Sequence, residues 1–115
     1  MTEENPLFAG FRQDIAAHDV VMYLKGTPET PFCGFSSAVV QVMKKLGVTF
    51  HGVNVLDDPA IFPALKEFSD WPTLPQIYIK GEFVGGCDIL REMAATGELQ
   101  AMLKEKAIPF TAEAA

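Results

Sequence analysis

The stretch VVMYLKGTPETPFCGFSS, residues 20–37, decides the fold class. Its first five residues form a short apolar run rich in strand-forming residues, which predicts a buried strand at 20–24. KGTPETPF consists largely of turn-forming residues and predicts a loop. A helix is expected after Cys33, because apolar residues recur at helical spacing up to Leu46 and Gly47 then ends the pattern. The stretch therefore predicts a strand, a loop and a helix, with a cysteine where the loop meets the helix.

The rest of the chain continues this alternation. Helices are predicted at 6–18, from Pro59 or from the residue after Phe62, after the GGCD stretch, and at 98–106, and strands at 49–55, 76–80 and 82–86. A hairpin turn is predicted at Lys80–Gly81. The order α-β-α-β-α-β-β-α-α implies a mixed sheet with helices on both faces. We therefore expect an α/β protein of thioredoxin-like fold, with a four-stranded mixed sheet flanked by about five helices.

The composition limits the location and the partners. The 115 residues fit a single domain over 1–115, with an ordered core at about 5–106 and a frayed tail from Thr111. The net charge of −6 argues against nucleic acid and anionic membranes as main partners. MTEENPLFAGF, at the N-terminus, is acidic and lacks the apolar run of a signal peptide, and no window of the sequence is apolar enough for a membrane helix. We therefore expect a cytoplasmic location, where a cysteine is more often reactive, metal-binding or buried than disulfide-bonded.

Cys33 is the first candidate functional residue. The free backbone N–H groups at a helix N-terminus carry partial positive charge, which favours a thiolate over a thiol. Lys25, at the end of the first strand, is expected to add to this effect. A thiolate is both a nucleophile and a ligand for soft metals. The alternative is a small buried apolar residue, against which the flanking turn formers argue.

Ser36 stands three positions after Cys33, where a dithiol redox enzyme carries its second cysteine. A serine hydroxyl forms no disulfide. A mixed disulfide at Cys33 must therefore be resolved by an outside thiol, unless the thiolate remains a ligand. Ser36 also fits as an ordinary residue of the first helical turn, and the two interpretations are compatible.

Two further stretches, WPTLPQ at 71–76 and GGCD at 85–88, precede predicted elements. A cis bond before Pro75 would leave backbone groups free to pair with a peptide-like ligand, although spacing alone favours an ordinary trans bond. The glycines of GGCD allow close backbone approach, and the helix start after them suits a carboxylate. Asp88 either caps this helix or pairs with a ligand amine, whereas Cys87 is more often a packed small residue.

Four motifs occur together in the order and at the intervals of one family. They are KGTP at 25–28, CGFS at 33–36, WPTLPQIY at 71–78 and GGCD at 85–88. Over about Asn5 to Lys106 the chain resembles the monothiol, CGFS-type glutaredoxins. Each motif alone is weak, but four in register are specific. The resemblance implies a thioredoxin-like fold, a glutathione site and an active thiol at Cys33.

The resemblance also implies which residues form the glutathione site. They are Lys25, Thr73, Leu74, Pro75, Cys87 and Asp88, around the active Cys33. Lys25 would contact glutathione and help to hold the thiolate. The two residues before a cis Pro75 would pair with the tripeptide backbone, and the pair at 87–88 would bind its γ-glutamyl end.

Members of this family typically carry iron–sulfur clusters. The resemblance implies that two subunits, each through its Cys33, and two glutathiones hold one 2Fe–2S cluster, with BolA-like proteins as partners and iron–sulfur apoproteins as recipients. The chemistry agrees, because such a cluster needs about four thiolates and one chain offers a single exposed thiolate. The apolar and small residues near it suit either a shielded contact between subunits or simple packing; they are Phe32, Gly34, Phe35 and Gly86.

One departure from the family pattern concerns Phe62, where relatives usually carry an arginine that binds a carboxylate of glutathione. A charge-assisted contact is worth ~1.5–3 kcal/mol, so its loss would weaken glutathione binding ~10-fold or more. Lys66, one turn further on, is the residue that would substitute for it.

Two other functions stay open beside the cluster carrier. The first is a glutathione-dependent oxidoreductase that removes glutathione from protein thiols by a monothiol route through Cys33. The second is a redox sensor in which Cys33 and Cys87 form a disulfide.

Overall fold

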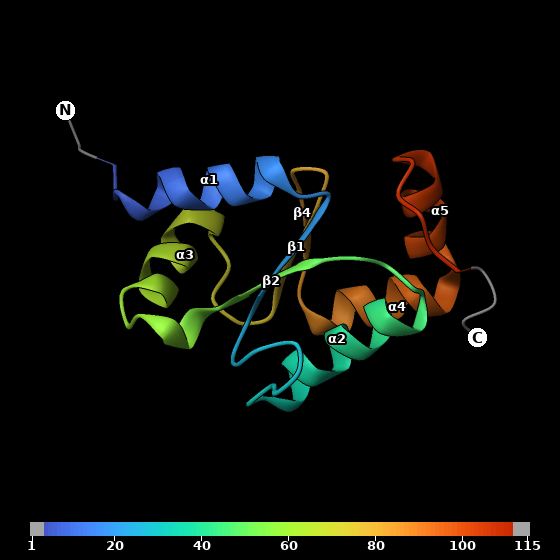
Figure 1. Ribbon diagram of the computed structural model, residues 1–115, viewed down its shortest axis with the longest axis horizontal. Helices are drawn as coiled ribbons and strands as arrows, with labels where there is room; N and C mark the ends of the chain where they lie inside the picture. Colours follow the sequence, from blue (N-terminus) through green and yellow to red (C-terminus); the bar gives the residue numbers. More distant parts are fainter. Residues whose placement is uncertain (1–3, 112–115) are drawn as a thin grey trace.

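A four-stranded sheet forms the centre of the computed structural model, which describes residues 4–111 (Figure 1). Its strands are β1 (Val20–Leu24), β2 (His51–Asn54), β3 (Gln76–Ile79) and β4 (Glu82–Gly85). They lie in the order β2-β1-β3-β4, with β1 parallel to β2 and antiparallel to β3, and β3 antiparallel to β4. The predicted mixed sheet of thioredoxin-like type is confirmed. The predicted frayed tail falls almost wholly on residues 112–115, outside the described range.

Helices cover both faces of this sheet, as predicted. They are α1 (Leu7–Ala17), α2 (Gly34–Lys45), α3 (Ile61–Ser69), α4 (Cys87–Thr96) and α5 (Glu98–Glu105). One hydrophobic cluster joins the sheet to α2, α4 and α5, and a second joins it to α1 and α3 (Figure 1). Within the described residues, no helix combines the length and the apolar character needed to cross a bilayer.

The central strand β1 explains why the sheet is buried on both sides. Successive side chains of a strand point to opposite faces. Met22 and Leu24 therefore pack toward α2 and α4, whereas Val21 and Tyr23 pack toward α1 and α3, and all are fully buried. This is the burial expected from the uninterrupted apolar run VVMYL.

The second strand is shorter than predicted: it begins at His51, and a side chain ends it at Asn54. Asn54 Oδ1 accepts hydrogen bonds from the backbone N–H of Leu56, at 2.9 Å, and of Gly26, at 3.0 Å. The chain turns there into the short 3-10 helix η1 (Val55–Asp57). The same side chain therefore ends β2 and ties it to the loop that follows β1.

The third helix begins at Ile61, between the two predicted starts. Pro63 is its third residue, within the first turn, where backbone N–H groups have no partner inside the helix and a missing N–H costs little. The hairpin prediction is confirmed. Lys80 and Gly81 have φ values of 50° and 83°, the left-handed conformation of a tight two-residue turn.

Candidate functional site

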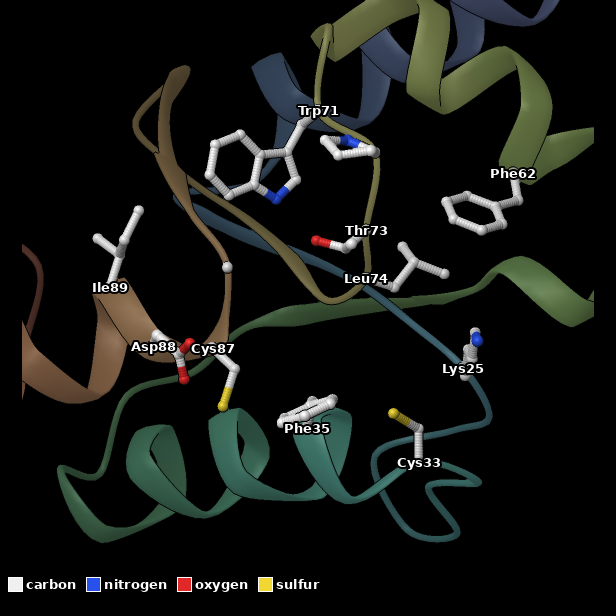
Figure 2. A pocket seen from close by; sticks show the side chains of 12 residues that line it. Lys25, Cys33, Phe35, Phe62, Trp71, Thr73, Leu74, Cys87, Asp88 and Ile89 are labelled. Carbon is white, nitrogen blue, oxygen red and sulfur yellow. The ribbon is translucent and has the colours of Figure 1, made fainter.

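A cavity of about 660 Å³ lies where the start of α2, the segment before β3 and the start of α4 meet (Figure 2). Its volume falls in the range of small-molecule sites, ~300–1,000 Å³. Its lining residues are Lys25, Cys33, Phe35, Phe62, Trp71, Pro72, Thr73, Leu74, Gly86, Cys87, Asp88 and Ile89. Segments from four separate parts of the sequence therefore build one site.

The predicted site residues come together here with one exception. Pro75 is buried and is not among the residues that line the cavity. The Leu74–Pro75 bond is cis, as the family resemblance implied and contrary to the trans bond that spacing alone favoured. The structure thus gives the positions of these residues, while their roles toward glutathione stay predictions.

A tight loop after β1 places Cys33. The backbone N–H of Phe32 donates to the Lys25 carbonyl at 2.9 Å, so the loop returns to its own starting point. Gly26 makes this return possible: its φ is +93°, and a Cβ there would lie 2.5 Å from the carbonyl oxygen of Thr30. The chain leaves this loop at Cys33, which is the N-cap of α2.

The position at the helix N-cap controls the charge on Cys33. Its side chain is partly exposed. The backbone N–H of Ser36 is the largest influence that lowers the pKa of the thiol, followed by the backbone N–H of Phe35 and the charge of Lys25; partial burial acts in the opposite direction. The net effect is a lowered pKa, so the predicted thiolate at a helix N-terminus is supported.

Ser36 is a fully buried residue of the first turn of α2. Its Oγ accepts a hydrogen bond from the backbone N–H of Lys25 at 3.1 Å, across the base of the loop. The residue at the position of a second redox cysteine therefore connects the end of β1 to the helix that carries Cys33.

Gln76 is a site residue that the sequence analysis missed. It is fully buried, and its Nε2 donates to the carbonyl oxygens of Trp71 and Thr73, each at 3.2 Å. These bonds fix the segment that forms one wall of the cavity (Figure 2). A buried polar residue must find such partners, so a glutamine at the start of an apolar strand was the available signal.

The opposite wall is the start of α4. Cys87 is 6% exposed and is the first helical residue, whereas Asp88 is exposed in the first turn. The N-cap is Gly86 and no side chain caps the helix, so the first of the two alternatives for Asp88, a helix cap, is wrong; its carboxylate lines the cavity (Figure 2). Close backbone approach is confirmed at Gly86, where a Cβ would lie 3.3 Å from the Pro75 carbonyl oxygen.

Phe62 lines the cavity from α3. The ammonium of Lys66 lies 4.8 Å from the centroid of its ring, in a cation–π contact. Lys66 is itself not a lining residue. Its substitution for the missing arginine therefore stays a prediction, as does a Cys33–Cys87 disulfide, since both cysteines are unpaired here.

A four-stranded mixed sheet with a partly exposed thiol at a helix N-terminus defines the class of thioredoxin-like thiol proteins. The glutaredoxin family model matches residues 20–84. A probable monothiol glutaredoxin 2 of Rickettsia typhi is 50% identical over 103 residues, which cover 90% of this chain and 93% of that protein. The chain belongs to the glutaredoxin family, within the monothiol branch that its motifs indicate.

Solved structures support the same assignment. A monomeric truncated mutant of Trypanosoma brucei 1-C-Grx1 superposes with a TM-score of 0.83 at 40% identity, over 90% of this chain and 94% of that chain. A buckwheat glutaredoxin in complex with glutathione superposes with a TM-score of 0.76 at 27% identity, over 85% of this chain and 87% of that chain.

Proposed function

We propose that the cavity binds glutathione and that Cys33 of two subunits, with two glutathiones, holds a 2Fe–2S cluster for assembly and transfer. The observation that carries the proposal is that Cys33 has a serine, Ser36, at the position where a dithiol enzyme has its second cysteine. The thiol is partly exposed with a lowered pKa, and the residue that would be its disulfide partner is a buried, hydrogen-bonded serine. Such a thiolate needs an external partner.

The cavity suits glutathione in charge and in shape. A lysine ammonium stands at the Cys33 end, and the Asp88 carboxylate stands at the other (Figure 2). A tripeptide with carboxylates and one amine would therefore meet opposite charges at its two ends. Thr73 and Leu74 line the cavity at a bend in the chain just before β3, where their backbone groups would pair with a peptide-like ligand. The buckwheat relative, whose structure contains glutathione, supports this assignment.

The thiolate count supports a shared cluster. A 2Fe–2S centre takes about four thiolates. Cys87 is buried, so one chain offers one accessible thiolate, and residues 4–111 contain no group of three or more His, Cys, Asp or Glu side chains arranged around a metal position. Phe32 and Phe35, 69% and 59% exposed beside Cys33, would be covered in a contact between two subunits.

Anaerobic reconstitution with iron, sulfide and glutathione tests the proposal. The wild type should become a coloured dimer, seen by visible absorption and circular dichroism and by mass on the same sample. Cys33→Ser, or omission of glutathione, should give a colourless monomer, whereas Cys87→Ser should still bind the cluster. A colourless wild-type monomer rejects the proposal.

The exposure of the thiolate also favours a second candidate, a glutathione-dependent oxidoreductase. The Cys33 thiolate would attack the glutathione sulfur of a mixed disulfide, forming a Cys33–glutathione disulfide and releasing the protein thiolate. A second glutathione thiolate would then attack that disulfide, releasing Cys33 and glutathione disulfide. Brisk, glutathione-saturable turnover that Cys33→Ser abolishes would favour this enzyme over the carrier.

We also propose the partners that this role requires, BolA-like proteins and iron–sulfur apoproteins, in a cytoplasmic compartment. A reducing compartment suits a chain whose two cysteines are both free. Transfer of the cluster from the reconstituted dimer to an apo-ferredoxin, followed by circular dichroism, is the measurement. A cluster that decays at the same rate with and without the acceptor contradicts the transfer role.

A further inference from the structure

The positive charges of this acidic chain are distributed unevenly. Three of its nine Lys and Arg residues pair with carboxylates, as Arg12–Glu4, Lys80–Asp19 and Lys106–Glu82. Lys25 lines the cavity, Lys66 lies over the ring of Phe62, and Lys104 belongs to α5. The other three, Lys44, Lys45 and Arg91, line one groove. One surface thus gathers a third of the positive charge of a chain whose net charge is −6.

This basic groove, of about 800 Å³, runs along α2 beside α4. Its α2 wall includes Gly34, Ser37, Gln41 and Lys44, which recur at helical spacing and share one face of the helix. At 1.5 Å per residue this face is ~16 Å long. An extended segment of about five residues spans that length. One end of the groove is Gly34, the residue next to Cys33.

No salt bridge within the described residues neutralises the three cations, and no Asp or Glu lines the groove. Lys44 and Lys45 stand in the last turn of α2, where they also stabilise the negative end of the helix dipole. That role does not apply to Arg91, which comes from the middle of α4. Cations from two helices therefore face one space with their charge uncompensated.

We propose that the basic groove docks an acidic segment of the protein that exchanges a cluster or a disulfide with Cys33. Carboxylates of that segment would pair with the two lysines and Arg91, and the partner's reacting group would then lie at the Gly34 end, beside the thiol. The net charge of −6 repels every polyanion at long range, and this repulsion is smallest for a short acidic segment, which carries fewer charges than nucleic acid or an anionic membrane and matches the length of the groove. The inference rests on the proposed function in one respect, that the sulfur of Cys33 is the reacting atom.

Fluorescence anisotropy with two labelled, cysteine-free peptides of equal length tests the proposal, one rich in glutamate and the other with glutamine in its place. The glutamate peptide should bind the full chain at least ~10-fold more tightly than the glutamine peptide does. Added salt should weaken the binding of the glutamate peptide. General electrostatics predict the opposite preference, because the chain is acidic. Since the peptides contain no thiol, the result does not depend on glutathione or cluster binding.

Charge-removing variants locate the site. Lys44→Gln, Lys45→Gln and Arg91→Gln should each weaken binding of the glutamate peptide ~2–5-fold, as exposed ion pairs do, and the triple variant should abolish the preference over the glutamine peptide. Lys104→Gln, on α5, is the matched control and should bind as the wild type does. Equal binding of the two peptides, an unchanged triple variant with native circular dichroism, or tighter binding of an oligouridylate RNA would each overturn the proposal.

Discussion

Ser36 connects two parts of the site through one hydroxyl group. Its Oγ accepts the backbone N–H of Lys25, and its hydroxyl also contributes to the lowered pKa of Cys33. A smaller side chain would leave the Lys25 N–H without an acceptor in a partly buried place. The residue that makes the protein monothiol is therefore also a structural residue of the active loop.

Ser36→Ala should lower the free energy of unfolding by about 1–3 kcal/mol, the cost of an unsatisfied donor, and should raise the pKa of Cys33. Denaturant unfolding and pH-dependent alkylation measure the two effects. Ser37→Ala is the matched control, because no side-chain hydrogen bond joins Ser37 to another described residue, and its effect should stay within about 0.5 kcal/mol. Equal stability of the two variants would contradict the structural role of Ser36.

Phe62, whose ring lines the cavity, stands where the family resemblance leads us to expect an arginine. Phe62→Arg should strengthen glutathione binding ~10-fold, by a charge-assisted contact with a glutathione carboxylate. Isothermal titration of the reduced protein measures the affinity. Phe62→Met, which removes the ring without adding charge, should show no such gain. An Arg variant that binds no better than Met would show that this position does not face a carboxylate.

At the scale of elements, the segment 71–75 depends on Gln76, the first residue of β3. Gln76→Met removes both hydrogen bonds to the wall of the cavity, so it should weaken glutathione binding as well as lower stability by about 1–3 kcal/mol. Gln100 is the matched control: its Nε2 donates to the Ala94 carbonyl near the C-terminal end of α4, whereas the cavity lies at the start of that helix. Gln100→Met should affect stability alone, and equal glutathione affinity in both variants contradicts the positioning role of Gln76.

The boundaries of β2 and α3 show what sequence reasoning could not supply. The pattern of apolar residues located both elements, but the end of β2 depends on a contact between Asn54 and Gly26, which are far apart in the sequence. Pro63 allowed two starts for α3, and the helix begins between them at Ile61, after a turn in which Asp58 accepts hydrogen bonds from the backbone N–H groups of Ala60 and Ile61. Apolar patterns locate elements, whereas particular hydrogen bonds, some of them between distant residues, set their ends.

At the scale of the whole molecule, two buried tyrosines make the α1–α3 side of the sheet sensitive to alkali. Burial is the main cause that raises the pKa of Tyr78 to about 12, and burial, followed by the charge of Asp14, raises the pKa of Tyr23 further. Their rings meet edge to face on one face of the sheet, from the neighbouring strands β1 and β3. Both side chains belong to the second hydrophobic cluster, so ionising either one disturbs that core.

Unfolded tyrosine ionises near pH 10, so above that pH the unfolded state binds fewer protons than the folded state. The free energy of unfolding should therefore be insensitive to these groups below about pH 10 and should fall as the pH rises toward 12. Denaturant titrations across this range measure it. The double variant Tyr23→Phe, Tyr78→Phe should lose less stability than the wild type, and parallel losses would contradict the assignment.

The cavity was largely predictable because its motifs are local and each places a recognisable group. Lys25, Cys33 and Asp88 could be named from loop and helix-start patterns and from the family resemblance. The basic groove could not be predicted from the sequence, because Arg91 comes beside the lysines of α2 only when α4 packs against that helix. A glutamine at the start of an apolar strand signals a buried polar residue, but the role of Gln76 could not be predicted, because its two partners are backbone carbonyls whose positions only the folded loop defines.

The pH dependence of Cys33 alkylation tests the central claim most directly. It is best measured in Cys87→Ser, so that iodoacetamide reports on Cys33 alone. The structure predicts that the alkylation rate rises with a midpoint at a lower pH than in a free cysteine peptide. In Lys25→Gln, which removes one source of positive charge, this midpoint should shift back toward the value of the peptide. A midpoint at or above that of the free peptide would contradict a thiolate stabilised at the start of α2, and with it the proposed glutathione and cluster chemistry.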